Sequence, residues 1–170
     1  MIMAVKKYSI KILRHLELLW SSVVLNICAV LIYVYIIGVN APLYITVGFF
    51  GFFLIVNLLP VLILHTQYLI ENKEVELIID KTDRRITYKK NGKFLEANFS
   101  DIVELSYCSS YGRGSWYTFA DYEFCKISFS NKTEIFVTCL LMKNVKNTLE
   151  DLLDTKADAR LRFLALLPIR

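Results

Sequence analysis

The stretch LLWSSVVLNICAVLIYVYIIGVNAPLYITVGFFGFFLIVNLLPVLILHTQYLI, residues 18–70, decides the fold class of this chain. It contains no Asp, Glu, Lys or Arg, and Asn40-Ala41-Pro42 lies near its middle. The hydrocarbon core of a bilayer is about 30 Å thick, and a helix needs about 20 apolar residues to cross it. The stretch therefore predicts a hairpin of two membrane-spanning helices, at about residues 16–38 and 43–64, joined by a tight turn.

Basic residues before the first span set the expected orientation. Lys6, Lys7, Lys11 and Arg14 precede it, and such clusters stay on the cytoplasmic side of a membrane. Two spans return the chain to that side, so we expect a multi-pass protein of the inner (plasma) membrane with both termini cytoplasmic. A cleaved signal peptide is the competing interpretation, but the apolar run is too long and a second span follows at once.

Composition and charge limit the classes of partner. The 170 residues are 55% hydrophobic, and their mean hydropathy is +0.44. The net charge of +4 comes from the ends, because residues 1–17 and 155–170 carry +3 each and residues 66–154 carry −2. Nucleic acid binding needs a concentrated basic face, so we expect no nucleic acid partner. The four cysteines form no CxxC pair and there are only two histidines, so we expect no metal site and no cofactor.

The hydrophobic period changes from helical to alternating after the hairpin. Alternation predicts strands at about residues 75–80, 85–90, 94–99, 102–107, 121–130 and 133–140, and residues 67–72 could add one more. Asn91-Gly92 is a strong hairpin signal. A helix with one apolar face follows at about residues 143–154. The order predicts a mainly antiparallel β barrel, of the pleckstrin-homology (PH) type, closed by one C-terminal α-helix.

The chain resembles bacterial PH-like (YcxB-like) membrane proteins, which place a two-span hairpin before such a domain. The matching stretches are residues 65–80, Lys90-Asn91-Gly92-Lys93, Asn98-Phe99-Ser100-Asp101-Ile102 and residues 133–141. The sequence predicts a basic N-terminus at residues 1–15, a transmembrane hairpin at 16–65, a cytoplasmic PH-like domain at 66–154 and a basic apolar tail at 155–170. The resemblance covers residues 16 to about 153 of this order, and it implies no catalytic residues.

A long loop rich in aromatic residues is the leading candidate for function. Aromatic and Arg side chains on Gly and Ser backbone are typical of protein contact surfaces. The loop therefore predicts contact with an unidentified membrane or cytoplasmic protein, although the aromatics could instead complete the core or touch the membrane. The candidate partner-binding residues are Tyr107, Tyr111, Arg113, Trp116, Tyr117 and Phe119.

A basic β-hairpin is the second candidate, because clustered cations near a membrane attract anionic headgroups at about 1 kcal/mol each. Asp80 and Asp83 interrupt the cluster, so an ordinary solvated hairpin is the alternative. The candidate lipid-headgroup residues are Lys81, Arg84, Arg85, Lys89, Lys90 and Lys93.

The remaining sequence favours a binding role over catalysis. It contains no GxSxG, HExxH or P-loop motif, so we expect no enzyme. The tail could lie on the membrane or continue the last helix against the domain. Gly48 and Gly51 offer a close-packing surface, through which the spans could form a homo-oligomer. The expected function is a membrane-anchored module that binds a protein, and the alternatives are a sensor of anionic lipid or envelope stress and an immunity protein against a membrane-directed toxin.

Overall fold

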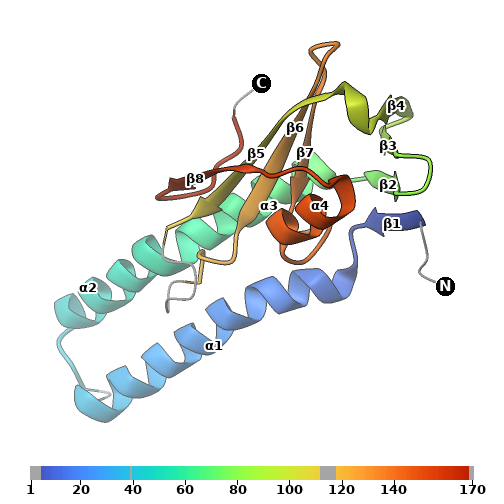
Figure 1. Cartoon of the computed structure of the whole chain (residues 1–170). Helices are drawn as coiled ribbons and strands as arrows, with labels where there is room; N and C mark the ends of the chain where they lie inside the picture. The colour runs from blue at the N-terminus through green and yellow to red at the C-terminus, as the bar shows by residue number, and fades with distance from the viewer. Residues whose placement is uncertain (1–4, 39, 112–117, 169–170) are drawn as a thin grey trace.

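Two long apolar helices form an antiparallel hairpin (Figure 1). The computed structural model describes residues 5–38, 40–111 and 118–168. The first helix is α1 (Ile12–Ile36), and the second runs without a break through α2 (Leu43–Phe53), the π-helical turn η1 (Leu54–Leu58) and α3 (Leu59–Asn72). Both helices are long and apolar enough to cross a membrane, by length and composition. The wide turn η1 ends two residues before Pro60, which has no backbone N–H to donate to the preceding turn.

Four antiparallel strands form the first sheet. They are β1 (Val5–Ser9), β2 (Glu76–Asp80), β3 (Arg85–Lys90) and β4 (Lys93–Asn98), in that order across the sheet. Asn91 and Gly92 both have positive φ, as a two-residue hairpin turn requires, which confirms the predicted turn. Strand β1 was not predicted, and its pairing with β2 joins the N-terminus to the first sheet.

The second sheet follows the short helix η2 (Phe99–Asp101). It contains β5 (Ile102–Ser110), β6 (Glu123–Phe129), β7 (Glu134–Thr138) and β8 (Asp158–Arg162), in the order β7-β6-β5-β8. Strand β8 runs parallel to β5, and the other pairs are antiparallel. The amphipathic helix α4 (Val145–Leu153) lies between β7 and β8 in the chain and buries its apolar face, as predicted.

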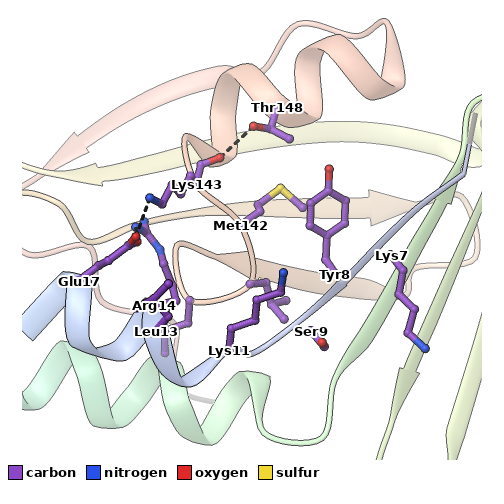
Figure 2. Close-up of a pocket in the computed structure, with 12 residues that line it drawn as sticks. Lys7, Tyr8, Ser9, Lys11, Leu13, Arg14, Glu17, Met142, Lys143 and Thr148 are labelled. Atoms are coloured by element: carbon purple, nitrogen blue, oxygen red, sulfur yellow. Dashed lines mark hydrogen bonds and ion pairs between the residues drawn. The ribbon is translucent and has the colours of Figure 1, made fainter. Parts of the chain in front are cut away.

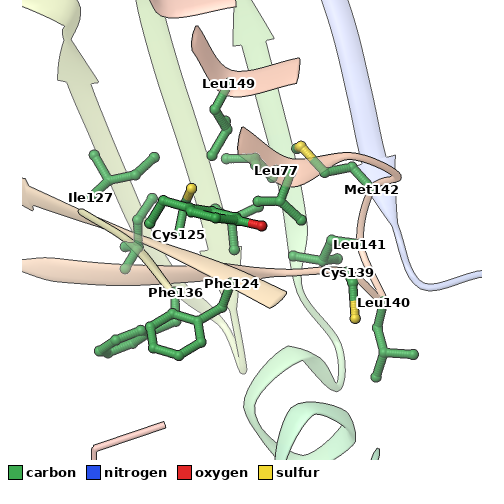
Figure 3. Packing of buried hydrophobic residues seen from close by; sticks show 14 of the residues in the cluster. Leu77, Phe124, Cys125, Ile127, Phe136, Cys139, Leu140, Leu141, Met142 and Leu149 are labelled. Atoms are coloured by element: carbon green, nitrogen blue, oxygen red, sulfur yellow. The ribbon is translucent and has the colours of Figure 1, made fainter. Parts of the chain in front are cut away.

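One hydrophobic core joins the sheets, α4 and the base of the hairpin. Figure 3 shows Leu149 of α4 above Leu77 of β2 and Cys125 of β6. The long helices supply core residues too, because Leu18 of α1 and Leu64 of α3 are buried in the same cluster. The helices are therefore part of the domain as well as an apolar hairpin.

Three predictions about the fold were wrong. The sheets do not close into a barrel among the described residues, because β1 and β8 extend two separate open sheets. Residues 67–72 are helical, since Tyr68 and Asn72 continue the buried helix face of Val61 and Leu64. Of the two alternatives for the tail, continuation of α4 is wrong, because α4 ends at Asp154, which has positive φ, and the chain then pairs with β5 as β8; contact of the tail with the membrane stays a prediction.

Candidate functional site

A basic pocket lies where α1 leaves the first sheet. Its volume is about 520 Å³, and it opens between β1, the first turns of α1 and the connection from β7 to α4 (Figure 2). The polar or charged side chains that line it are Lys7, Tyr8, Ser9, Lys11, Arg14, Glu17, Lys143 and Thr148. Four of these are cations and one is a carboxylate, so the pocket has an excess of positive charge.

Ion pairs inside the pocket leave part of that charge uncompensated. Glu17 accepts hydrogen bonds from Nη1 of Arg14 at 2.9 Å and from Nζ of Lys143 at 2.8 Å, so one carboxylate serves two cations. Lys7 pairs with Glu76 of the neighbouring strand at 2.9 Å. Within the part of the chain that the structure describes, Lys11 has no carboxylate partner. An anion in the pocket would therefore find one free cation and two that share a single negative charge.

Local structure adds to the attraction for an anion. Helix α1 begins after Lys11 with no acidic residue in its first turn, so the positive end of the helix dipole is not compensated by a side chain. Nε of Arg14 donates to the carbonyl of Cys139 at 2.8 Å, which fixes the helix against the end of β7. Burial, and next the charge of Asp151, raise the pKa of the Tyr8 phenol, so its hydroxyl stays protonated and can donate a hydrogen bond.

A chain of polar contacts holds the hairpin to the domain beside this pocket. The imidazoles of His15 and His65 are joined at 2.9 Å, and Nδ1 of His65 lies 2.9 Å from the hydroxyl of Tyr122. Burial raises the pKa of Tyr122 above its usual value, which keeps this hydroxyl neutral. Further along α3, the Tyr68 hydroxyl donates to the carbonyl of Ala165 at 2.6 Å. The helices and the domain are thus joined by specific bonds as well as by the core.

The structure divides the predicted aromatic loop. Tyr107 is buried and donates its hydroxyl to Glu123 at 2.5 Å. Phe119 is also buried, with its ring 5.7 Å from that of Phe163. Tyr111 is exposed. Tyr107 and Phe119 therefore belong to the core, which is the alternative interpretation of these aromatics. Three further candidates, Arg113, Trp116 and Tyr117, lie outside the described residues.

Most cations of the predicted basic β-hairpin already have partners. Lys81 pairs with Asp154 at 3.2 Å, Arg85 with Glu96 at 2.9 Å and Lys90 with Glu71 at 2.9 Å. Arg84 and Lys89 lie over the rings of Phe99 and Phe94, respectively, and Lys93 lines a second pocket of about 460 Å³. In Figure 1 the strands β2, β3 and β4, which carry this cluster with their connecting turns, lie at the end of the molecule opposite the tip of the helical hairpin. The arrangement favours the solvated hairpin over contact with a membrane that holds that tip.

The basic pocket was not predicted as a site. In the sequence, Lys7, Lys11 and Arg14 indicate only the orientation of the first span, and Lys143 is far away along the chain. The salt bridge from Lys143 to Glu17 joins residues 126 positions apart, which no local pattern reveals. Among the described residues, no group of three His, Cys, Asp or Glu side chains is placed to hold a metal ion.

Comparison with known proteins identifies the family. A family model described as a PH domain matches residues 7–149. The chain belongs to this PH-domain family. The match begins in β1 and ends in α4, so it includes both long helices and the residues of the basic pocket. No curated protein and no solved structure matches the chain. The PH-like part of the sequence resemblance is confirmed, and the YcxB-like part stays a prediction.

Proposed function

We propose that this PH-domain protein is a non-enzymatic binding module that is anchored in a membrane by its helical hairpin and binds an anionic lipid headgroup in the basic pocket. The observation that carries the proposal is the position of the pocket. Lys11 is the residue before α1, and Arg14 lies in the first turn of this helix. Both come shortly before the charge-free stretch. In a bilayer that contains this stretch, those cations lie at headgroup level, where anionic lipids are found.

The chemistry of the pocket suits a phosphate-bearing headgroup. Ammonium groups of Lys7, Lys11 and Lys143 supply charge, and the hydroxyls of Tyr8 and Ser9 can donate hydrogen bonds. The volume of about 520 Å³ is in the usual range for a small-molecule site. The expected contact with a protein through Tyr111 stays a prediction, with less support because Tyr107 and Phe119 are buried.

A matched pair of single substitutions tests the pocket. Full-length protein is placed in nanodiscs of phosphatidylcholine alone, or with a quarter of phosphatidylglycerol, and its melting temperature is measured. Lys11→Ala removes the cation without a carboxylate partner, and Lys93→Ala removes an equal charge at the far end of the domain. One headgroup contact contributes about 1 kcal/mol, so Lys11→Ala should reduce the stabilisation by phosphatidylglycerol by about 2–4 °C.

The outcomes separate anchoring from headgroup binding. The proposal predicts that the wild type stays in the membrane pellet after alkaline carbonate treatment and that, of the two variants, only Lys11→Ala shows a reduced stabilisation by phosphatidylglycerol. Equal loss in Lys11→Ala and Lys93→Ala would mean that the lipid acts through net charge, and the pocket assignment would be wrong. Release of the wild type by carbonate would overturn the anchoring itself.

A further inference from the structure

The part of the hairpin that projects freely from the domain is short. The hydroxyl of Thr118 hydrogen-bonds the side chain of Asn57, and both residues are buried. His15 pairs with His65, and Tyr33 pairs with Thr46, so Asn57 lies level with about Ser22 on the antiparallel helix. The free helices are therefore residues 23–36 and 43–56, each about 21 Å long at 1.5 Å per residue.

That free length does not cross a bilayer by itself. The hydrocarbon core is about 30 Å thick, and the turn between the helices adds only a few ångström. The predicted second span, residues 43–64, continues past Asn57 to Leu64, which is about 10 Å further along the helix. If this whole span lies in hydrocarbon, the side of the domain that packs beside residues 57–64 enters the membrane with it.

The domain presents an apolar surface on that side. We define the apolar edge as Tyr111, Leu161 and Phe163, which are 61%, 71% and 71% exposed. These residues adjoin one another, because the backbone N–H of Tyr111 donates to the carbonyl of Arg162 at 2.7 Å. The ring of Phe163 contacts Phe119, which follows Thr118 in the chain, so the edge is continuous with the helix at Asn57. Figure 1 shows β5 and β8 ending on the side of the hairpin tip.

The charges beside the apolar edge fit a lipid surface better than a dry protein interface. Arg160 and Arg162 alternate with Leu161 and Phe163 along β8 and its end, and both arginines are exposed. Long cationic side chains beside aromatic and aliphatic ones are typical of segments at the headgroup level, where the cations reach phosphates and the apolar groups enter the acyl region.

We propose that the apolar edge is inserted into the same membrane that holds the hairpin, with Leu161 and Phe163 at the boundary of the acyl chains and Arg160 and Arg162 at the phosphates. The inference rests on the proposed anchoring but not on the headgroup pocket. It makes β8 a second membrane contact, which fixes the tilt and rotation of the domain over the lipid surface.

Spin labels on the full chain in bilayers of phosphatidylethanolamine and phosphatidylglycerol test this depth. Cys28 is the exposed native cysteine, and Cys108, Cys125 and Cys139 are buried, so a label attached before reconstitution reports from the hairpin. In a Cys28→Ala background, Phe163→Cys reports from the apolar edge and Phe94→Cys from an exposed site on β4. Collision rates with oxygen, which enters lipid, and with a water-soluble nickel chelate give the depth of each label.

The three labels give outcomes that separate the two proposals. We expect the label at Cys28 to be accessible to oxygen and not to nickel, and the label at Phe94→Cys to be accessible to nickel. The label at Phe163→Cys should show several-fold less nickel contact than that at Phe94→Cys, with higher oxygen contact. Equal nickel contact at the last two sites, with Cys28 protected, would overturn the insertion and leave the anchoring intact. Protection of Phe163→Cys from both reagents would indicate a second copy of the chain on the edge and also overturn it. Nickel contact at Cys28 would overturn both.

Discussion

Replacing one buried leucine of α3 should destabilise the PH-like domain, although the residue belongs to the apolar hairpin. Leu64 is 0% exposed and lies in the core cluster, whereas Leu62 on the same helix is 49% exposed. Leu→Ala in a packed core costs about 2–5 kcal/mol, from lost burial and the cavity left behind. Leu62→Ala makes the same chemical change on an outer face. For a chain of this size, 3 kcal/mol corresponds to a fall in melting temperature of roughly 6–12 °C.

The assay is thermal unfolding of both variants in the same detergent micelles, followed by near-ultraviolet circular dichroism of the tyrosines. Buried Tyr68 and Tyr122, whose ring centroids lie 5.6 Å apart, report on the junction between helix and domain. We expect Leu64→Ala to melt well below the wild type and Leu62→Ala to melt near it. Equal melting of the two variants would refute the claim that α3 forms part of the domain core.

Three further predictions concern stability. Asn72→Ala removes the donor to the carbonyl of Phe136 at 3.2 Å and the acceptor for the Thr138 hydroxyl; two lost buried bonds should cost about 2–4 kcal/mol in the same melting assay, and a change under 1 kcal/mol would contradict the assignment. Arg85→Ala breaks an exposed ion pair and should cost less than about 1 kcal/mol in that assay. Burial raises the pKa of the Cys139 thiol from 9.0 to about 12, so the contribution of this thiol to stability is full below pH 9 and is lost as the pH rises toward 12. Denaturant titrations between pH 9 and 11 should show that the free energy of unfolding falls about 1.4 kcal/mol less per pH unit in Cys139→Ala than in the wild type.

Elements with a strong local signal were predicted from the sequence. The charge-free stretch shows the two helices, Asn91-Gly92 shows the turn of a hairpin, and spaced leucines show α4. Strands β1 and β8 lack such signals, because both are charged edge strands with mostly exposed side chains. Their pairing depends on distant partners, since β1 pairs with β2 some seventy residues later in the chain. Edge strands of this kind are determined by tertiary structure more than by their own pattern.

The candidate sites also differ in whether a local sequence pattern reveals them or only the tertiary structure does. A cluster within 13 consecutive residues, such as the basic β-hairpin, is easily seen in sequence. In the fold, however, three of its six cations form ion pairs and two lie over aromatic rings. The basic pocket is assembled from β1, the start of α1 and the segment after β7, so only the fold brings its cations together. Burial of Tyr107 likewise depends on Glu123 of the adjacent strand, whose carboxylate accepts a hydrogen bond from the Tyr107 hydroxyl.

The proposed orientation explains why the positive charge of this chain is concentrated at its two ends. Residues 1–17 place Lys11 and Arg14 at the start of α1, and the tail places Arg160 and Arg162 on β8. The net negative residues 66–154 include the basic β-hairpin, which Figure 1 places at the end opposite the hairpin tip. An anionic leaflet would attract both ends of the chain and repel the intervening domain, about 1 kcal/mol for each cation at its surface. The charge pattern would thereby reinforce the geometry that the helices and the apolar edge impose.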